Sequence, residues 1–185
     1  HLPAYQKLTD MVEVVAIADI VPERAKAAAE KFGSFDLLIN LAGLSIPSKY
    51  AETEEAVYDK MMDVNVKGAF LLTRTALPLL RESVGKIINI SSMWGLSGAS
   101  CEVHYSASKA AIIGFTKALS KEVGPSGITV NCIAPGFIDT KMNAHLSEED
   151  VKEIVDCTPM MRAGKGEDVA YLCEFLASKK ASFII

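Results

Sequence analysis

Short apolar runs rich in β-branched residues alternate with longer helix-forming stretches along this chain of 185 residues. The runs predict strands at 12–19, 36–41, 86–91 and 128–134. The stretches between them predict helices at 22–32, 53–81, 105–123 and 167–177. Strands without regular polar alternation, each followed by a helix, are typical of a parallel sheet covered on both faces. We therefore expect an α/β fold with a doubly wound parallel sheet, in a single Rossmann-like domain spanning residues 1–185.

Several helix starts carry recognisable signals. Pro22 opens an alanine-rich segment, and Thr53 can cap the long helix that follows it. Ser147 precedes three acidic residues, which predicts a further helix N-terminus and a lid-like segment. We see no internal repeat or linker that would divide the chain.

Polar or turn-forming residues stand at the ends of three predicted strands. Asn40, Ser92 and Pro135 each fall at or just after the carboxyl end of a strand. In open parallel sheets, ligands bind at these ends. We therefore expect the functional site there.

Tyr105 and Lys109 lie four residues apart in a predicted helix and so share one face of it. An isolated tyrosine has a pKa of about 10, and we expect the nearby ammonium to lower that pKa. The Ser92 hydroxyl could hold a carbonyl oxygen against the phenol. Such groups could pass a proton to or from an alcohol while a cofactor moves a hydride. Taken alone, the pair also fits a packing contact with a solvated end, which is the commoner case in an arbitrary helix.

Other motifs accompany this pair in a definite order. They are Asn40-Leu41-Ala42-Gly43, Asn65 within 63–68, the strand and hydroxyls of 85–92, the strand 128–134, and the turn 135–140. In order and spacing these motifs resemble the short-chain dehydrogenase/reductase family from about Gly33 to the end of the chain. Within that family the chain looks closest to the 3-oxoacyl-(acyl carrier protein) reductase type.

The resemblance implies a catalytic set. Tyr105 matches the family's general acid/base, and Lys109 matches the lysine that lowers the tyrosine pKa and binds the nicotinamide ribose. Ser92, and not Ser91, matches the serine that polarises the substrate carbonyl. Asn65 matches the asparagine that holds a water in a proton relay to the lysine.

The resemblance also implies cofactor contacts. Residues beside the adenosine ribose would be Asn40, Ala42 and Gly43, and those packed on the nicotinamide and its carboxamide would be Pro135, Gly136, Ile138 and Thr140. Leu41 stands where the family usually has a second asparagine, so only backbone contacts are expected at that position.

Some parts of the family pattern have no match. The glycine-rich phosphate turn, T-G-x-x-x-G-x-G, is not found, and a further strand and helix have no room between Phe32 and Asp36, since a βαβ unit takes roughly 30 residues. The chain also stops at Ile185, where the family continues to a T-G turn and a last strand. We therefore expect a fold that lacks the first strand and the glycine-rich turn, with segments missing before residue 1, between 32 and 33, and after 185.

Residues 1–32 fit the short-chain family loosely. They look more like the second strand and helix of a Rossmann domain of the glucose-fructose oxidoreductase/inositol dehydrogenase type. Three explanations stay open: the sequence omits pieces of a longer protein, it joins fragments of two Rossmann folds, or its N-terminal residues are wrongly assigned.

Asp19 ends the strand predicted at 12–19. An acidic residue there hydrogen-bonds the adenosine ribose hydroxyls and repels a 2′-phosphate, which favours NAD. The resemblance to acyl carrier protein reductases favours NADPH instead. The cofactor is therefore expected to be NADP or NAD, and Asp19 could also be an ordinary turn residue.

Composition narrows the remaining classes. A net charge of −4 without a basic cluster argues against a nucleic-acid partner. No apolar run approaches the roughly 20 residues of a membrane span, and no signal peptide opens the chain, so we expect a cytoplasmic protein. The cysteines form no C-x-x-C pair and the three histidines are scattered, so we expect no metal site and buried, reduced thiols. The cysteines are Cys101, Cys132, Cys157 and Cys173.

We therefore expect an NAD(P)(H)-dependent reductase of a ketone, with a 3-oxoacyl thioester as the substrate that the resemblance implies. Glu102, His104 and Trp94 are expected at the entrance of the site, although His104 could equally be a plain surface residue. The expected partners are a small or acyl-carrier-linked ketone and further copies of the chain, packed through helices 53–81 and 105–123 into a homodimer or homotetramer. The alternative is a truncated or fused Rossmann fragment that only oligomerises and has no activity.

Overall fold

Three parallel strands form the centre of the computed structural model, which describes residues 35–144 and 146–185. The strands are β1 (Leu37–Asn40), β2 (Lys86–Ile90) and β3 (Thr129–Ile133), hydrogen-bonded in the order β1-β2-β3. Because all three are parallel, their carboxyl ends meet at one edge of the sheet. The strand predicted at 12–19, the helix predicted at 22–32 and Asp19 lie outside the described residues.

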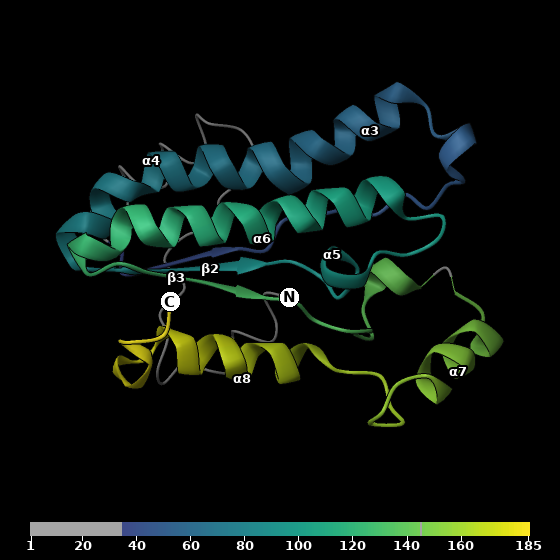
Figure 1. Ribbon diagram of the computed structural model, residues 1–185. Coiled ribbons are helices and arrows are strands. Elements are labelled where there is room, and N and C mark those ends of the chain that lie inside the picture. Colours follow the sequence, from purple (N-terminus) through teal and green to yellow (C-terminus); the bar gives the residue numbers. More distant parts are fainter. Residues whose placement is uncertain (1–34, 145) are drawn as a thin grey trace.

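Helices cover both faces of the sheet (Figure 1). Helices α4 (Gly68–Ser83) and α6 (Val103–Val123) lie on one face, and α8 (Gly166–Ala177) lies on the other. The short helix α5 (Trp94–Ser97) follows β2, and α7 (Glu148–Asp156) stands apart from the sheet, beyond the carboxyl ends of the strands. The 3-10 turns are η2 (Tyr50–Glu52), η4 (Gly124–Ser126), η5 (Lys141–Asn143) and η6 (Lys179–Ala181). The predicted α/β fold with a parallel, doubly covered sheet is confirmed.

The strands are apolar on both sides because each side packs against helices. Successive residues of a strand point to opposite faces, so Ile87 and Ile88 belong to different clusters. The cluster under α4 and α6 contains Leu38, Ala76, Leu80, Ile87, Val123, Ile128 and Val130. The cluster under α8 contains Ile88, Ile90, Ile133, Cys173, Leu176 and Ala181. This two-sided burial explains why the strands read as continuous apolar runs.

The long helix predicted over 53–81 is present as an uninterrupted helical run, but it begins at Glu55 and contains a π turn that was not predicted. The run consists of α3 (Glu55–Met62), the π-helical turn η3 (Asp63–Lys67) and α4. Thr53 does not cap a helix, because its hydroxyl donates to the Lys49 carbonyl at 3.0 Å. A π turn is wider than an α turn and is common at functional sites; this one contains Asn65, which is buried.

The helix start predicted at Ser147 is confirmed. The Ser147 hydroxyl accepts a hydrogen bond from the Asp150 backbone N–H, and the Asp150 carboxylate accepts one from the Ser147 N–H. This reciprocal pair satisfies N–H groups that have no partner within a helix. It fixes the start of α7.

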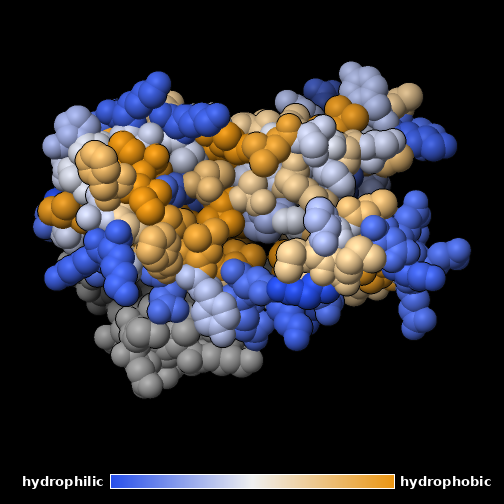
Figure 2. Space-filling view, turned by 60° about the horizontal axis from the view of Figure 1, so that its bottom comes forward, coloured by the Kyte–Doolittle hydropathy of each residue, from blue (hydrophilic) through white to orange (hydrophobic). Residues whose placement is uncertain are grey.

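The outer face of α8 remains partly apolar. Tyr171, Leu172 and Phe175 are exposed on it. Figure 2 turns this side toward the viewer and shows hydrophobic side chains gathered across its middle, with hydrophilic side chains around them. Among the helices that the structure describes, none is both long and apolar enough to cross a bilayer.

Candidate active site

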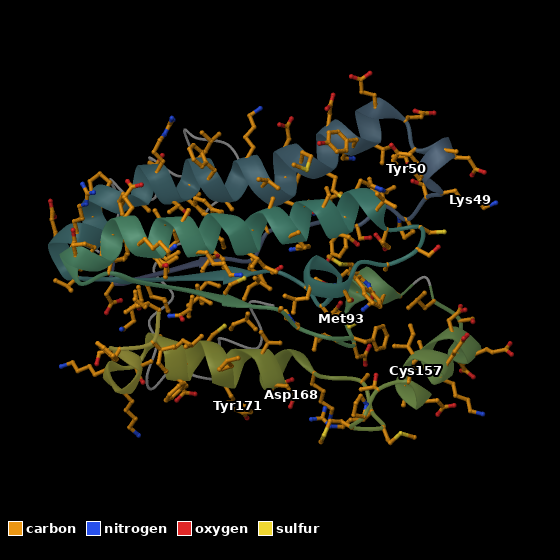
Figure 3. All side chains as sticks on the ribbon, in the orientation of Figure 1. Lys49, Tyr50, Met93, Cys157, Asp168 and Tyr171 are labelled. Carbon is orange, nitrogen blue, oxygen red and sulfur yellow. The ribbon has the colours of Figure 1, made fainter. Side chains whose placement is uncertain are left out.

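The segments that follow the three strands converge at the carboxyl edge of the sheet. The Ser91 N–H donates to the Ile133 carbonyl at 2.8 Å, and the Met93 N–H donates to the Pro135 carbonyl at 2.9 Å. Figure 3 shows Met93 below α5, on the side of the segment that follows β3. The site therefore has a floor held together by backbone hydrogen bonds.

Tyr105 and Lys109 occupy successive turns of α6 above this floor. Both side chains are buried, with exposed fractions of 9% and 4%. The Lys109 Nζ donates to the Ile90 carbonyl at 3.0 Å and lies 5.7 Å from the centre of the Tyr105 ring. The shared face expected from the four-residue spacing is confirmed.

Burial lowers the pKa of Lys109 to about 8. The cause is the loss of water around the ammonium, and the nearby Cys132 thiol opposes it only in part. Lys109 therefore carries its charge at neutral pH but loses it in mildly alkaline solution.

The expectation that Lys109 lowers the pKa of Tyr105 is wrong for the structure as it stands. Burial raises the pKa of Tyr105 above its ordinary value, a hydrogen bond with Ser92 lowers it, and the Glu102 carboxylate raises it again. Desolvation disfavours the charged phenolate and is the largest effect. Tyr105 is consequently a neutral phenol at pH 7, which is the form that donates a proton.

The two adjacent serines have different surroundings. The Ser91 hydroxyl donates to the Lys109 carbonyl at 2.7 Å and so fixes α6 to the end of β2. The Ser92 hydroxyl accepts a hydrogen bond from the Trp94 N–H at 3.2 Å and faces the Tyr105 phenol. Only Ser92 is placed beside the phenol.

Asn65 connects the loop after β1 to α6. Its Oδ1 accepts from the Leu44 N–H at 2.8 Å, and its Nδ2 donates to the Leu44 carbonyl at 2.9 Å and to the Ser108 hydroxyl at 3.0 Å. The Ser108 hydroxyl in turn donates to the Tyr105 carbonyl at 2.8 Å. Both N–H groups of the Asn65 amide are therefore engaged, directly behind Tyr105.

Gly43 lets this loop pass close to the lysine. A Cβ atom at this position would lie 3.1 Å from the Lys109 Nζ and 3.5 Å from the Asn65 Oδ1. Few side chains tolerate contacts this short. The structure thus brings Gly43, Asn65 and Lys109 together.

Asn40 points into the protein. Its Nδ2 donates to the Thr73 hydroxyl at 2.9 Å and to the Asn89 Oδ1 at 2.7 Å. Asn89 then donates to the Thr116 hydroxyl at 2.8 Å. This buried chain of hydrogen bonds joins α4, β1, β2 and α6, and it engages the side chain that the sequence placed beside the adenosine ribose.

Asn89 is a member of this hydrogen-bonded network that the sequence did not predict. It is fully buried, with an exposed fraction of 0%, in the apolar strand β2. A single amide within such a run is the available signal, because buried polar groups need hydrogen-bond partners.

The segment after β3 is held by backbone contacts with Gly164 on one side and is exposed at Gly136. Ile138 pairs with Gly164 in a parallel bridge, and the Asp139 N–H donates to the Gly164 carbonyl at 2.9 Å. Gly136 is exposed, and a Cβ there would meet only the Met93 sulfur, at 3.8 Å. Ala42 is also exposed, and Pro135 and Thr140 are half-buried.

Two expectations about the entrance need correction. His104 neither lines the mouth nor lies on the surface, because it is buried and its Nε2 contacts the Ile46 carbonyl at 2.8 Å. The four cysteines form no disulfide, but Cys101 and Cys157 are exposed, and only Cys173 is fully buried. Glu102 and Trp94 are half-buried.

The described residues fit one half of a nicotinamide dinucleotide. A phenol and an ammonium side by side can serve ribose hydroxyls, and the open surface above Gly136 leaves room for a flat ring. The part of the chain that the structure describes contains no glycine-rich turn for a pyrophosphate. Within that part, no group of three or more histidine, cysteine or acidic side chains is placed to hold a metal ion.

A parallel sheet with a tyrosine, a lysine and a serine at its carboxyl edge defines a Rossmann-like oxidoreductase. Comparison with known proteins agrees: a family model described as enoyl-(acyl carrier protein) reductase matches residues 14–185. The chain belongs to the short-chain dehydrogenase/reductase family of NAD(P)-dependent oxidoreductases.

Curated relatives match most of the chain. The 3-oxoacyl-[acyl-carrier-protein] reductase FabG of Rickettsia conorii is 40% identical over 174 residues, which cover 94% of this chain and 71% of the relative. The reductase of the same name from Staphylococcus aureus is 40% identical over 171 residues, covering 92% and 70%. That of Chlamydia muridarum is 38% identical over 167 residues, covering 90% and 67%.

The family match begins well before Gly33. It starts at residue 14 and so includes most of the segment likened above to another type of Rossmann domain. The short-chain family therefore accounts for residues 14–32 as well.

Proposed function

We propose that this protein reduces the ketone of a 3-oxoacyl thioester carried by acyl carrier protein, with NADPH or NADH as the reductant. The observation that carries the proposal is the convergence of Ser92, Tyr105 and Lys109 at the carboxyl edge of the sheet. Relatives at about 40% identity that bear the name 3-oxoacyl-[acyl-carrier-protein] reductase support the substrate class.

The side chains would divide the work as follows. The hydroxyls of Ser92 and Tyr105 bind the carbonyl oxygen and stabilise the negative charge that grows on it. Tyr105 transfers its proton to that oxygen, and the Lys109 ammonium stabilises the phenolate left behind. Asn65 holds the loop after β1 against α6 and supports a water-mediated route to the lysine. A bound NAD(P)H supplies the hydride that the carbonyl carbon receives.

The cofactor would lie along the carboxyl edge of the sheet. Tyr105 and Lys109 would hold the nicotinamide ribose. The other proposed contacts are Asp19, Asn40, Ala42, Gly43, Pro135, Gly136, Ile138 and Thr140. Since the Asn40 side chain is engaged within the protein, its contribution is through the backbone or through the sheet it holds together. Asp19 favours NAD and the family resemblance favours NADPH, so a comparison of kcat/KM with the two reductants decides the preference.

The name of the matching family model favours a second candidate, reduction of an enoyl thioester. That reaction delivers a proton to carbon, whereas two hydroxyls that converge on one point suit a carbonyl oxygen. We therefore place ketone reduction first.

The test is Tyr105→Phe in the full chain, with NADPH or NADH consumption followed in the presence of an acetoacetyl thioester. We expect turnover to fall by roughly 10²- to 10⁴-fold, because the proton donor is lost. Tyr58→Phe, at an exposed tyrosine of α3, is the matched control and should leave turnover unchanged. Turnover retained in Tyr105→Phe would contradict the mechanism, and turnover of a crotonyl thioester alone would favour the enoyl reaction.

We also propose a homodimer or homotetramer, with residues 1–185 forming part of one Rossmann-like domain. Helix α6 exposes a row of small residues, and Phe115 of the same helix contacts Phe70 of α4. The row is Ala107, Ala110, Gly114 and Ala118. Small side chains allow the backbones of two helices to approach closely, which suits packing against a second copy.

A further inference from the structure

The loop after β1 is tied to the start of α6 at three points. The Ser48 N–H donates to the Cys101 carbonyl at 2.9 Å, and His104 Nε2 contacts the Ile46 carbonyl at 2.8 Å. Cys101 itself has a φ of 60°, a left-handed conformation that costs a non-glycine residue free energy. The third link lies between these two, at Glu102.

The Glu102 carboxylate is held at a defined place. The Ser45 hydroxyl lies 2.8 Å from one carboxylate oxygen and 2.9 Å from the other. Glu102 precedes the first residue of α6, yet its side chain does not cap the helix. The carboxylate is therefore directed toward the loop and stands three residues before Tyr105, about one helical turn away.

We propose that Glu102, fixed by Ser45, is a positioning residue that keeps the proton of Tyr105 on the phenol oxygen. This inference rests on the proposed function only for its consequence in catalysis. The contacts between Ser45 and Glu102 are present in the protein without substrate.

The groups around the phenol support this role. Ser92 approaches from the end of β2, Lys109 from the next turn of α6, and Glu102 from the preceding turn. Ser92 lowers the pKa of Tyr105, whereas Glu102 raises it because a nearby negative charge disfavours a phenolate. On the other packed elements, Cys132 of β3 acts on Lys109, and Asn65 of η3 is uncharged.

The expected consequence concerns the pH range of the reaction. Ketone reduction needs the phenol, and alcohol oxidation needs the phenolate. The equilibrium constant at a given pH fixes the ratio of the two rates, so Glu102 moves the pH break of both directions upward together. A carboxylate at this position thus extends proton donation to more alkaline solution.

The test follows the ionisation of Tyr105 directly. The full chain would be labelled with 3-fluorotyrosine, whose ring fluorine lowers the phenol pKa into an accessible range and reports ionisation by ¹⁹F NMR. Tyr105→Phe identifies the resonance. We expect Glu102→Gln, which keeps a partner for Ser45, to lower the titration midpoint by roughly 0.5 pH unit or more.

Matched variants separate this effect from a change of net charge. Glu122→Gln removes the same charge near the other end of α6, about 26 Å from Tyr105 at 1.5 Å per residue, and should not move the midpoint. Ser45→Ala leaves the charge but frees the carboxylate, and should lower the midpoint by a smaller amount. The proposal is overturned if Glu102→Gln shifts the midpoint no more than Glu122→Gln does. It is also overturned if the midpoint is unchanged in both single variants, Ser45→Ala and Glu102→Gln.

The NMR result and the activity assay can fail separately. A shifted midpoint in a protein that reduces no ketone upholds the role of Glu102 and rejects the proposed function. Turnover of an acetoacetyl thioester with an unshifted midpoint upholds the proposed function and rejects the role of Glu102. In an active enzyme, the pH breaks of reduction and oxidation should both fall by the same amount in Glu102→Gln.

Discussion

Ser91 and Ser92 are neighbours in sequence but act in different parts of the molecule. Strand β2 ends at Ile90, just before them; the Ser91 hydroxyl then meets the Lys109 carbonyl, and the Ser92 hydroxyl lies beside the phenol. Ser91 holds the Lys109 carbonyl, whereas Ser92 lies beside the Tyr105 phenol, where the proposed mechanism places the substrate oxygen. Their substitution separates a structural hydroxyl from a functional one.

We expect Ser92→Ala to lower kcat/KM for an acetoacetyl thioester by about 10²-fold, because one donor to the carbonyl oxygen is lost. Ser91→Ala should lower kcat/KM less than tenfold and reduce the free energy of unfolding by about 1 kcal/mol, the usual contribution of a buried hydrogen bond. Steady-state kinetics and urea denaturation of both variants provide the comparison. Equal loss of activity in the two variants would contradict the assignment.

Lys109 is a buried charge that costs stability. Its pKa falls from 10.5 to about 8 on folding, so the unfolded chain binds this proton more tightly than the folded protein does. Below pH 8 both states are protonated and the full cost is present. Between pH 8 and 10.5 the unfolded state carries more of the proton, and stability from this group rises with pH.

Lys109→Met keeps most of the side-chain volume and removes the charge. At pH 7 we expect the free energy of unfolding of the variant to exceed that of the wild type by roughly 1–3 kcal/mol, after allowance for the lost hydrogen bond to Ile90. The difference should shrink as the pH is raised from 8 toward 10.5, while reductase activity is lost. Urea titrations at pH 7 and pH 9.5 measure this, and a difference that does not change with pH would contradict it.

At the scale of elements, Gly95 allows α5 to pack closely against α6. A Cβ at Gly95 would lie 2.8 Å from the Lys109 carbonyl carbon, 2.8 Å from the Ser91 hydroxyl and 3.0 Å from the Ala110 nitrogen. Two of these atoms are backbone and cannot move aside alone. The glycine thus sets how closely α5 approaches the catalytic helix.

We expect Gly95→Ala to push α5 away from α6, to lower the free energy of unfolding by about 1–3 kcal/mol and to reduce turnover, because Lys109 and Ser91 move with it. Gly114→Ala is the control, since Gly114 lies inside α6 and nothing lies within 4 Å of a Cβ there. It should be neutral or slightly stabilising. Thermal unfolding and activity of both variants test the contact.

The π turn η3 and the network around Asn89 show how elements are joined behind the site. Asn65 joins η3 to α6 and to the loop after β1, and Asn89 joins β2 to β1 and α6. Each amide is buried and is satisfied by partners from other elements. The position of α6, and with it that of Tyr105, therefore depends on polar contacts as well as on the apolar core.

For the whole molecule, the row of small residues on α6 predicts self-association. Gly114→Glu places a charged side chain in the row and should shift the molar mass toward the monomer in size-exclusion chromatography with light scattering. Lys152→Glu, an exposed change on α7, is the control and should leave the mass unaltered. A wild-type chain that is already monomeric would contradict the proposed assembly.

The sequence by itself determined the α/β class, the strands β1 to β3, and the group Ser92, Tyr105 and Lys109. Apolar runs and short motifs are local, so their meaning survives without coordinates. It also indicated the start of α7, because Ser147 and Asp150 cap that helix within a few residues of each other.

Only the tertiary structure decided the π turn η3 within the long helix, the burial of His104, the inward turn of Asn40 and the raised pKa of Tyr105. Each depends on groups distant in the chain: Asn65 bonds to Leu44, and Asn40 bonds to Asn89. The Tyr105 pKa was misjudged because a spacing of four residues reveals a neighbouring charge but not the loss of water. Desolvation is set by everything packed around a group, and that is known only once the chain is folded.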